Sequence, residues 1–525
     1  MRRGGGEILC PASTFQMRPS PRFLANVVAP TMLGASLLFV YLRTLAPGLT
    51  WANHGSDGGD LITAAFTAGV PHPTGYPLYL ILAGLFQSLP LGSLAFRTNL
   101  MSALAASLAA VLVYAIVARA QPALRSNNGW LAGMVSGYVF GLAPLVWSQA
   151  VITEVYALQA LLTAWVLYLY TRPVETSRRR LDVWRGLGLG LATSNHLTAL
   201  LLVPAAFLAG SFRDRAETTS TANHSGFERL EFDTSALLRQ LVGLATGLSL
   251  YLILPVRALA NPPVNWGNAV TPARFWWLVS GQIYRSYYLH LALAEVWEHI
   301  QSAAAVLLAQ FGIPGTLLAL VGLVVYWERS GLTLLTSWVA VVFTAFNTLY
   351  GSPDSQVYLI PVVLSFAVWA GMGVGRILPG TYARGRCRPY FMALLIILYF
   401  ALRATGQLSR VDASKDIRAE TFANEVLATA PENAIVFAEG DEAVFALWYY
   451  HFALGERADL AILATDLLHF DWYQENLRAT YPSLVVPGPF PWPEAITVAN
   501  PSRIACYVQH TNRTEISCPQ SMINP

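Results

Sequence analysis

The sequence predicts an all-α polytopic membrane protein with a small α/β domain at its C-terminal end. Two observations lead to this fold class. First, 54% of the 525 residues are hydrophobic and only 12% are charged, whereas a soluble globular protein carries roughly 25% charged residues. Second, apolar runs long enough to cross a bilayer recur as far as residue 406, and the composition changes from residue 407 onward. The net charge of +3 gives no reason to expect a nucleic-acid partner.

The N-terminal segment 1–26 is predicted to be a cytoplasmic tail, because basic residues are enriched on the cytoplasmic side of membrane helices. The apolar segment that follows, 27–47, is long enough to span a bilayer, which takes roughly 20 residues. Residues 48–97 are therefore predicted to form the first outer loop of a membrane domain that extends over 27–406. The basic residues of the tail are Arg2, Arg3, Arg18 and Arg22.

The first outer loop combines acids, glycines and prolines between residues 51 and 79. Ser56 or Asp57 is expected to cap a short helix over residues 59–68, which Gly69 would end. A proline fixes its own φ and restricts the residue before it. The sequence therefore predicts a rigid, extended turn after this helix, with prolines at Pro71, Pro73 and Pro77.

The apolar run 78–90 decides the topology of the next segments. It is too short to span a bilayer, so we expect it to lie in the outer interface. The longer runs 98–118, 130–148 and 152–171 are predicted to cross, which leaves the basic clusters that follow residues 118 and 171 inside. Between residues 8 and 173 the chain has three acids, and this topology places all of them on the outer face: Asp57, Asp60 and Glu154.

The later part of the membrane domain is predicted from the same rules. Residues 185–210 read as two half-crossing helices that meet near His196, and residues 211–237 as a cytoplasmic loop. An outer loop rich in aromatic residues is expected over 256–300. The remaining predicted spans are 238–255, 303–327, 331–350, 356–377 and 390–406, for a total of about 11 membrane helices.

Residues 407–525 are predicted to form an extracytoplasmic α/β domain, because helix-like and strand-like segments alternate there. Cys506 and Cys518 would be able to pair if this part lies outside the cell. The expected helices are 413–430 and 442–453, and the expected strands are 434–439, 460–464 and 503–508.

The three outer acids are the candidate catalytic residues. An ionisable group near a bilayer is costly, about 2.5–3.5 kcal/mol at a helix centre, so acids that persist there are candidates for function. An ionised carboxylate such as Asp57 can deprotonate an acceptor hydroxyl. The alternatives are helix capping by Asp57 with Asp60 in the first turn, and a membrane-end position for Glu154. A metal site with His54 and His72 is a further alternative, although the spacing matches no known metal motif.

A second group of residues is suited to an anion or a sugar. Asn195 and His196 interrupt an apolar run, and Arg257 follows the predicted span 238–255. A guanidinium can bind phosphate through two hydrogen bonds, and Trp and Tyr stack on the apolar face of a sugar. The alternatives are a packed histidine, an arginine that snorkels to the interface, and an aromatic belt over residues 266–288.

Several stretches resemble one large bacterial membrane family of unassigned function, which shares its domain with the eukaryotic transmembrane protein 260-like O-mannosyltransferases. The match covers most of the chain. It begins with Pro47-Gly48-Leu49-Thr50, Asp57-Gly58-Gly59-Asp60, HPTGYPL (72–78) and Arg97-Thr98-Asn99. It continues with WSQAVITEVYALQ (147–159), GLGLATSNHLT (188–198), Pro255-Val256-Arg257, Asn265-Trp266-Gly267, Asp354 with Tyr358-Leu359-Ile360-Pro361, AIVFAEGDE (434–442) and GERAD (455–459).

This resemblance implies the GT-C superfamily, whose members transfer sugars from polyprenyl-phosphate donors on the outer or luminal face. It implies that Asp57 is the catalytic base and Glu154 a second acid. Asp60 departs from the glutamate that is usual in the family. By the same resemblance, donor-phosphate contacts fall on His196 and Arg257. We also expect Asn195 to bind the donor, and the candidate substrate-binding residues are His72, Tyr76, Asn265 and Trp266.

The predicted function is that of an inverting glycosyltransferase, multi-pass in the inner (plasma) membrane, with its active site on the outer face. It would transfer mannose or a similar hexose from a polyprenyl-phosphate donor to an acceptor protein or glycan. No cofactor is required by the sequence, and a divalent metal is left open. The alternatives are a cell-envelope lipid or polysaccharide transferase of the same fold, a transporter or flippase, and a non-catalytic assembly scaffold.

Overall fold

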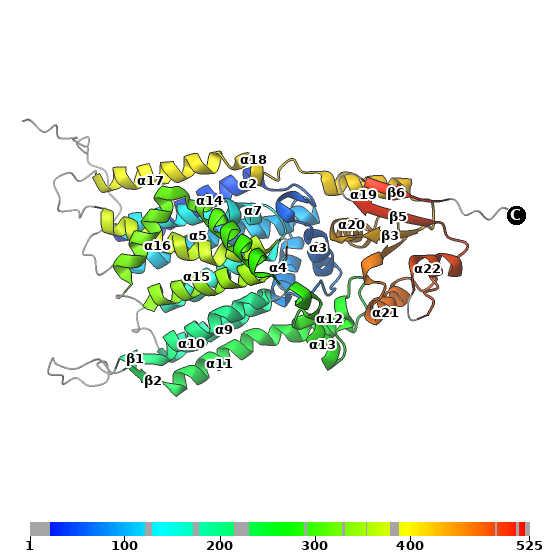
Figure 1. The fold of residues 1–525 in the computed structure, drawn as a ribbon, viewed down its shortest axis with the longest axis horizontal. Helices are drawn as coiled ribbons and strands as arrows, with labels where there is room; N and C mark the ends of the chain where they lie inside the picture. Colours follow the sequence, from blue (N-terminus) through cyan, green and yellow to red (C-terminus); the bar gives the residue numbers. More distant parts are fainter. Residues whose placement is uncertain are drawn as a thin grey trace, which may run out of the picture.

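A computed structural model describes residues 21–519 apart from 121–128, 172–177, 215–229, 288–290, 328–330, 353, 379–387, 489–490 and 511–513. The chain folds into a long bundle of helices with a smaller α/β unit at one end (Figure 1). Most of the predicted cytoplasmic tail lies outside the described residues. Among the described residues, six helices are long and apolar enough to cross a membrane, or up to seven if one bent pair is counted. The predicted total of about 11 membrane helices stays a prediction.

The first outer loop forms the short helix that the sequence predicts, but without the predicted cap. Helix α3 covers Gly58–Phe66, and Asp57 occupies its N-cap position with no capping hydrogen bond from its side chain. The short run that follows is the helix α4, Pro77–Gln87. The elements on either side are α1 (Pro21–Phe23), η1 (Leu24–Val28), α2 (Ala29–Thr44), η2 (Ala52–His54) and α5 (Leu94–Ala120).

The predicted single span 130–148 is wrong in detail, because it is two helices. Helices α6 (Gly129–Gly141) and α7 (Pro144–Ala150) are bent by 67° at a short break. Pro144 begins α7, and Ala143 before it is extended, with φ −63° and ψ 127°. A residue that precedes proline is pushed out of the helical region, which accounts for the bend.

Two helices that are distant in sequence, α9 (Arg178–Asn195) and α11 (Thr234–Leu248), pack very closely. A Cβ atom added at Gly186 would lie 1.9 Å from the Gln240 carbonyl oxygen, and one added at Gly190 would lie 2.4 Å from that of Leu244. Small residues allow such backbone contact between membrane helices. The neighbouring elements are α8 (Val155–Tyr170), η3 (Leu197–Leu202), α10 (Val203–Ser211), η5 (Ser249–Leu252) and α12 (Ile253–Ala258).

The break predicted near His196 is present, since this residue is extended between α9 and η3. The segment 211–237, predicted to be only a loop, contains a short antiparallel hairpin of β1 (Phe212–Asp214) and β2 (Leu230–Phe232). Asp233 follows this hairpin and caps α11 by accepting from the N–H groups of Ser235 and Ala236.

The predicted outer loop 256–300 is shorter than expected, because helix α14 (Leu293–Tyr326) begins well before residue 303. The Glu295 carboxylate accepts from the Ala292 N–H at 2.7 Å and stabilises this helix start. The helix is kinked at Gly312, where φ is 63°. The remaining elements of this part are η6 (Trp266–Asn268), α13 (Pro272–Val279), η7 (Gln282–Tyr287), α15 (Gly331–Leu349), η8 (Ser355–Leu359), α16 (Ile360–Ile377), α17 (Arg388–Thr405) and α18 (Leu408–Val411).

The C-terminal part is an α/β unit, as predicted. Its sheet has the strand order β4-β3-β5-β6, with β3 parallel to β4 and β5 and with β6 antiparallel to β5. Cys506 and Cys518 form a disulfide. The strands are β3 (Ile435–Glu439), β4 (Ala461–Ala464), β5 (Ala505–His510) and β6 (Thr514–Ser517). The helices are α19 (Arg418–Thr429), α20 (Asp441–Trp448), η9 (Tyr449–Ala453), η10 (Thr465–Leu467), α21 (Asp471–Thr480) and α22 (Pro493–Ala499).

The α/β unit is held against the first outer loop and the segment around α13. The Asp416 carboxylate accepts from the Thr50 hydroxyl at 2.6 Å and from the Trp51 N–H at 2.9 Å. Arg274 on α13 makes two hydrogen bonds to the Glu475 carboxylate on α21, at 2.7 and 2.8 Å. These contacts hold the domain beside the three acids that the sequence singled out.

Candidate active site

The start of α3 is the centre of the site. Gly58 and Gly59 open this helix between Asp57 and Asp60. A Cβ atom added at Gly59 would lie 2.2 Å from the carbonyl oxygen of Phe445 on α20. The absence of a side chain at Gly59 therefore lets the C-terminal domain pack directly on the helix that carries both acids.

Asp60 is fully buried and is bonded on both carboxylate oxygens. One oxygen accepts from the His72 backbone N–H at 2.9 Å and lies 2.7 Å from the His72 Nδ1 atom. The other accepts from the Trp266 indole N–H at 3.2 Å. Asp60 therefore orients His72 and Trp266, and its position does not leave it open to an acceptor.

His72 links the two acids. Its Nε2 atom lies 3.4 Å from an Asp57 carboxylate oxygen and 3.0 Å from the Tyr76 hydroxyl. Burial acts to lower the pKa of His72, but the charges of Asp57 and Asp60 outweigh it and raise the pKa to about 9. His72 is therefore a cation at neutral pH, held between two carboxylates.

Asp57 differs from Asp60 in being accessible, since a third of its side chain (33%) is exposed. Burial raises the pKa of Asp57 and the Asp60 carboxylate adds to this, while the His72 cation opposes it. This shift moves the pKa toward the range in which a carboxylate is an effective base at neutral pH. The Ser56 hydroxyl lies 3.4 Å from an oxygen of the same carboxylate.

Glu154 occupies the N-cap position of α8 and is only 4% exposed. Burial raises its pKa well above the ordinary value, and the Asp57 carboxylate raises it further. Both effects favour the neutral form of Glu154, in which its carboxyl can donate a hydrogen bond.

His196 lies in an aromatic cage that the sequence did not predict. Its ring centroid is 5.6–5.8 Å from those of Tyr76, Tyr156 and Tyr358. Its Nδ1 atom lies 2.8 Å from the Thr198 hydroxyl and 3.3 Å from the Thr198 backbone N–H. With Nδ1 as the acceptor of these contacts, the neutral ring carries its proton on Nε2. Tyr156 and Tyr358 are separated by some 200 residues, and only the fold brings them together.

The other predicted donor residues are placed differently. Asn195 is fully buried, and its amide donates to the Val155 carbonyl at 3.2 Å, which ties α9 to the start of α8. The Arg257 guanidinium donates to the carbonyl of Gly69 at 3.1 Å, at the far end of α3. Its described hydrogen bonds go to this end of α3 and not to His196. Asn265 is buried beside Val70 through a backbone bridge, so it supports the loop that carries His72.

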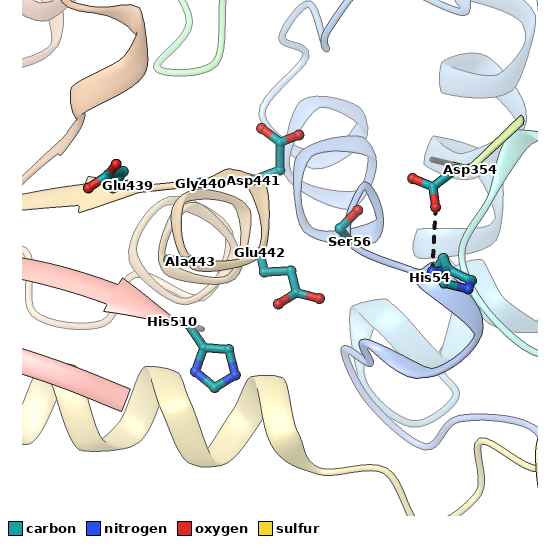
Figure 2. A pocket seen from close by; sticks show the side chains of 9 residues that line it. All are labelled: His54, Ser56, Asp354, Glu439, Gly440, Asp441, Glu442, Ala443 and His510. Atoms are coloured by element: carbon teal, nitrogen blue, oxygen red, sulfur yellow. Dashed lines mark ion pairs between the residues drawn. The ribbon is translucent and has the colours of Figure 1, made fainter. Parts of the chain in front are cut away.

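A cavity of about 270 Å³ lies between the first outer loop and the C-terminal domain (Figure 2). Apart from His54, which belongs to the metal alternative, its lining residues were not among the predicted site residues. Asp441 begins α20, and burial together with the Asp57 charge raises its pKa to about 6. The Gly-Asp-Glu run after a predicted strand was the available signal, because ligands of parallel sheets bind at the carboxyl ends of strands. The lining residues are His54, Ser56, Asp354, Glu439, Gly440, Asp441, Glu442, Ala443 and His510.

The metal alternative gains no support from the described part of the chain, where no three His, Cys, Asp or Glu side chains converge as metal ligands. His54 makes its ion pair with Asp354 at 3.4 Å. His72 is engaged with Asp57 and Asp60 as described above.

Two protein-family models match this chain, one in the membrane domain and one in the C-terminal domain. Residues 57–220 match a model described as the protein O-mannosyl-transferase TMEM260 N-terminal domain. Residues 419–512 match a model described as TMEM260-associated domain 2. The first match begins at Asp57, and the second covers most of the C-terminal domain, including the cavity residues from Glu439 to His510.

Two curated relatives carry the same name. The protein O-mannosyl-transferase TMEM260 of Mus musculus is 27% identical over 482 residues, which is 86% of this chain and 65% of the relative. That of Dictyostelium discoideum is 24% identical over 520 residues, which is 88% of this chain and 60% of the relative. The chain thus spans less than two thirds of the length of these relatives.

Among solved structures, ArnT from Cupriavidus metallidurans has a similar fold. Its apo form and its form bound to undecaprenyl phosphate both align with a TM-score of 0.57 at 15% sequence identity, over 93% of this chain and 93% of ArnT. At this identity the likeness concerns the fold, which is the GT-C arrangement that the sequence resemblance implied.

Proposed function

We propose, from the premise that this chain is a TMEM260-like protein with the GT-C fold, that it is an inverting membrane glycosyltransferase. It would transfer mannose or a similar hexose from a polyprenyl-phosphate donor to a protein hydroxyl. The curated relatives are named protein O-mannosyl-transferases, and the similar ArnT structure holds undecaprenyl phosphate. The observation that carries the proposal is the accessible Asp57 carboxylate beside the His72–Asp60 pair.

In the proposed reaction, Asp57 accepts the proton of the acceptor hydroxyl as the hydroxyl oxygen attacks the anomeric carbon. The bond between that carbon and the phosphate oxygen breaks, and its electron pair leaves with the phosphate. Attack from the face opposite the leaving group inverts the anomeric configuration. The His72 cation, held by Asp60, stabilises the Asp57 carboxylate in its ionised form and fixes its orientation.

The donor would bind on the side of Glu154 and His196. Protonated Glu154 can donate a hydrogen bond to the sugar or to the leaving phosphate. The Nε2–H group of His196 is a second donor, and the tyrosine rings around it supply faces for a sugar. Arg257 would contact the phosphate through the part of its guanidinium that does not bond Gly69.

The topology belongs to the same proposal, with the active site and the C-terminal domain on the outer face of the inner membrane. Val498 on α22 is 80% exposed, and Arg179 lies at the start of α9, on the side predicted to be cytoplasmic. A membrane-impermeant thiol reagent applied to intact cells should label a Val498→Cys variant and not an Arg179→Cys variant. The opposite labelling pattern would overturn the orientation.

The activity can be tested with the purified full chain in lipid nanodiscs. The substrates are a synthetic polyprenyl-phosphate mannose, the corresponding nucleotide sugar, and a serine-containing acceptor peptide. We expect transfer from the lipid-linked donor alone, with an inverted anomeric centre by NMR. Transfer from the nucleotide sugar, or retention of configuration, would contradict the proposal.

A further inference from the structure

The cavity of Figure 2 is built mainly by the C-terminal domain, for which the proposed reaction has so far supplied no role. Six of its nine lining residues come from that domain, on β3, α20, β5 and the turn between β3 and α20. Two come from the first outer loop, and Asp354 comes from the loop before η8. The cavity is therefore assembled from three segments that are distant in sequence.

The turn between β3 and α20 fixes the acidic wall of this cavity. Gly440 has φ 83°, a conformation that favours glycine, and its N–H donates to the Asp466 carboxylate at 3.0 Å. Asp441 and Glu442 come directly after this turn, at the first turn of α20. Because α20 packs on α3 at Gly59, the two carboxylates are held close to the start of α3.

The cavity lies next to the proposed base, with Ser56 between them. Ser56 lines the cavity, and its hydroxyl lies 3.4 Å from the Asp57 carboxylate. The charges of Asp441 and Asp57 influence one another, so the two carboxylates share one environment. A hydroxyl group bound in this cavity could thus reach Asp57.

The cavity has a strongly negative lining. Its four carboxylates are those of Asp354, Glu439, Asp441 and Glu442, and no lysine or arginine is among its lining residues. Of its two histidines, His54 is paired with Asp354, and the His510 ring packs against Trp51 at a centroid distance of 4.5 Å. The volume of about 270 Å³ is slightly below the usual range for ligand sites, roughly 300–1,000 Å³. It suits a short extended segment better than a folded surface.

We propose that this cavity is the acceptor subsite, that Asp441 and Glu442 are its specificity-determining residues, and that its ligand is a hydroxyl-bearing peptide segment flanked by basic residues. This inference rests on the proposed function. Complementary charge favours the correct partner, and like charges across a contact disfavour an acidic one. The C-terminal domain thereby selects the acceptor, while the membrane domain binds the donor.

Acceptor binding can be measured without any sugar transfer. The probes are fluorescent peptides with one serine flanked by lysine and arginine or by aspartate and glutamate, and a neutral hexose oligosaccharide. Fluorescence anisotropy with the full chain should show the basic peptide binding at least about tenfold more tightly than the acidic peptide. The double substitution Asp441→Asn with Glu442→Gln should reduce this ratio about 5–10-fold, and Asp441→Lys should reduce it further.

Glu494→Gln is the matched control, since it removes one carboxylate from the same domain at α22, outside the cavity lining, and should leave the ratio unchanged. Equal binding of the two peptides, or tighter binding of the oligosaccharide, would overturn the inference. So would a charge preference that the double variant retains. If the basic peptide binds as expected but no lipid-linked sugar is transferred, the proposed function fails while the subsite stands. If lipid-linked sugar is transferred but the two peptides bind equally, the subsite fails while the proposed function stands.

Discussion

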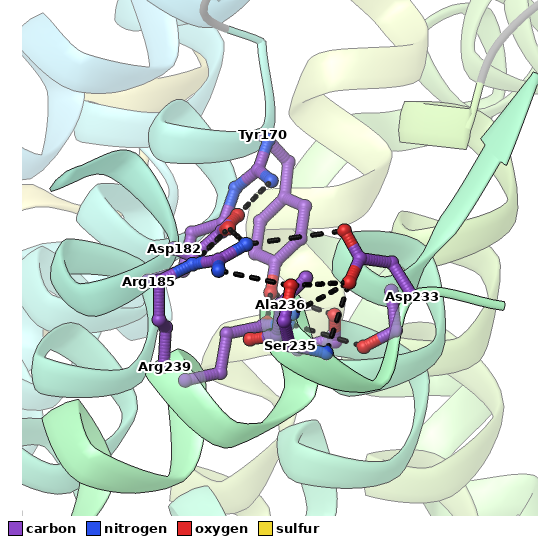
Figure 3. Close-up of polar contacts among 10 residues, drawn as sticks. Tyr170, Asp182, Arg185, Asp233, Ser235, Ala236 and Arg239 are labelled. Carbon is purple, nitrogen blue, oxygen red and sulfur yellow. Dashed lines mark hydrogen bonds and ion pairs between the residues drawn. The ribbon is translucent and has the colours of Figure 1, made fainter. Parts of the chain in front are cut away.

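The membrane domain contains clustered acids at both of its ends, and the two groups are built in opposite ways. At the end next to the C-terminal domain, three acids, Asp57, Asp60 and Glu154, share one basic side chain, His72. At the other end, Asp182 and Asp233 lie among two arginines, Arg185 and Arg239 (Figure 3). The first group carries an excess of negative charge, and the second is balanced.

The balanced group connects neighbouring helices. Asp182 is 1% exposed and accepts two hydrogen bonds from the Arg239 guanidinium, at 2.8 and 3.0 Å. The Arg185 guanidinium lies 4.5 Å from the centre of the Tyr170 ring, and the Tyr170 hydroxyl donates to the Ala206 carbonyl at 2.7 Å. These contacts join α8, α9, α10 and α11. His196 comes directly after the other end of α9, and Arg257 lies on α12, beyond the other end of α11.

The difference shows how to separate function from packing among buried charges. When buried acids are paired with an equal number of basic side chains, the joining of helices is enough to explain their presence. Acids held together against their mutual repulsion and next to a cavity are candidates for function.

Asp57→Asn should give the largest loss of activity. The amide keeps the shape of the side chain but cannot accept the acceptor proton, so the transfer rate should fall by roughly 10²–10⁴-fold. The fold should be intact, because the side chain makes no capping hydrogen bond. The measurement is the initial rate with the synthetic polyprenyl-phosphate donor. A wild-type rate in this variant would remove Asp57 as the base.

Asp182→Asn should act on stability and not on chemistry. Loss of one partner from a buried charge pair costs roughly 3–5 kcal/mol, because the remaining charges are left uncompensated. The midpoint of thermal unfolding in detergent should therefore fall, while the transfer rate per folded molecule should stay near that of the wild type. Unchanged unfolding would show that the network contributes little.

Asp60→Asn should lower the rate by roughly 10–100-fold, because Asp60 positions His72 without contacting the substrate. It should also change the pH profile. The wild type should lose activity as pH rises through about 9, where His72 loses its proton. Without the Asp60 charge the imidazolium is less stable, so this limb should move to lower pH. An unshifted alkaline limb would separate His72 protonation from activity.

Arg257→Lys should have the smallest of these effects. Lysine keeps the charge but lacks the planar fork that binds phosphate through two hydrogen bonds. We expect the KM for the lipid-linked donor to rise about 3–10-fold at nearly constant kcat. An unchanged donor KM in this variant would show that Arg257 does not bind the donor. Its role would then be limited to its hydrogen bond with the Gly69 carbonyl at the end of α3.

The sequence was sufficient to predict those parts of the candidate site whose residues are close together in the chain. The acids of the first outer loop, the HPTGYPL turn and the break at His196 could be read directly. The role of Asp60 could not, because its partners His72 and Trp266 are 12 and 206 residues away. The cavity was missed for the same reason, since Asp441 reaches the site only after the C-terminal domain packs on Gly59.

Three errors in the predicted secondary structure each have a specific physical cause. The bend at Ala143 interrupts an apolar run whose hydropathy alone indicates one span. Strand β6 is short and polar, and it forms by pairing with β5, so no local pattern indicated it. The early start of α14 depends on the bond between Glu295 and the Ala292 backbone, which cannot be seen in hydropathy.

We infer that the acid group around Asp57 performs chemistry and that the group around Asp182 holds helices together. The most direct test compares Asp57→Asn and Asp182→Asn side by side, measuring both the transfer rate per folded molecule and the thermal midpoint. We expect Asp57→Asn to lose the rate and keep the midpoint, and Asp182→Asn to lose the midpoint and keep the rate. A wild-type rate in Asp57→Asn, or a lost rate at an unchanged midpoint in Asp182→Asn, would contradict the account.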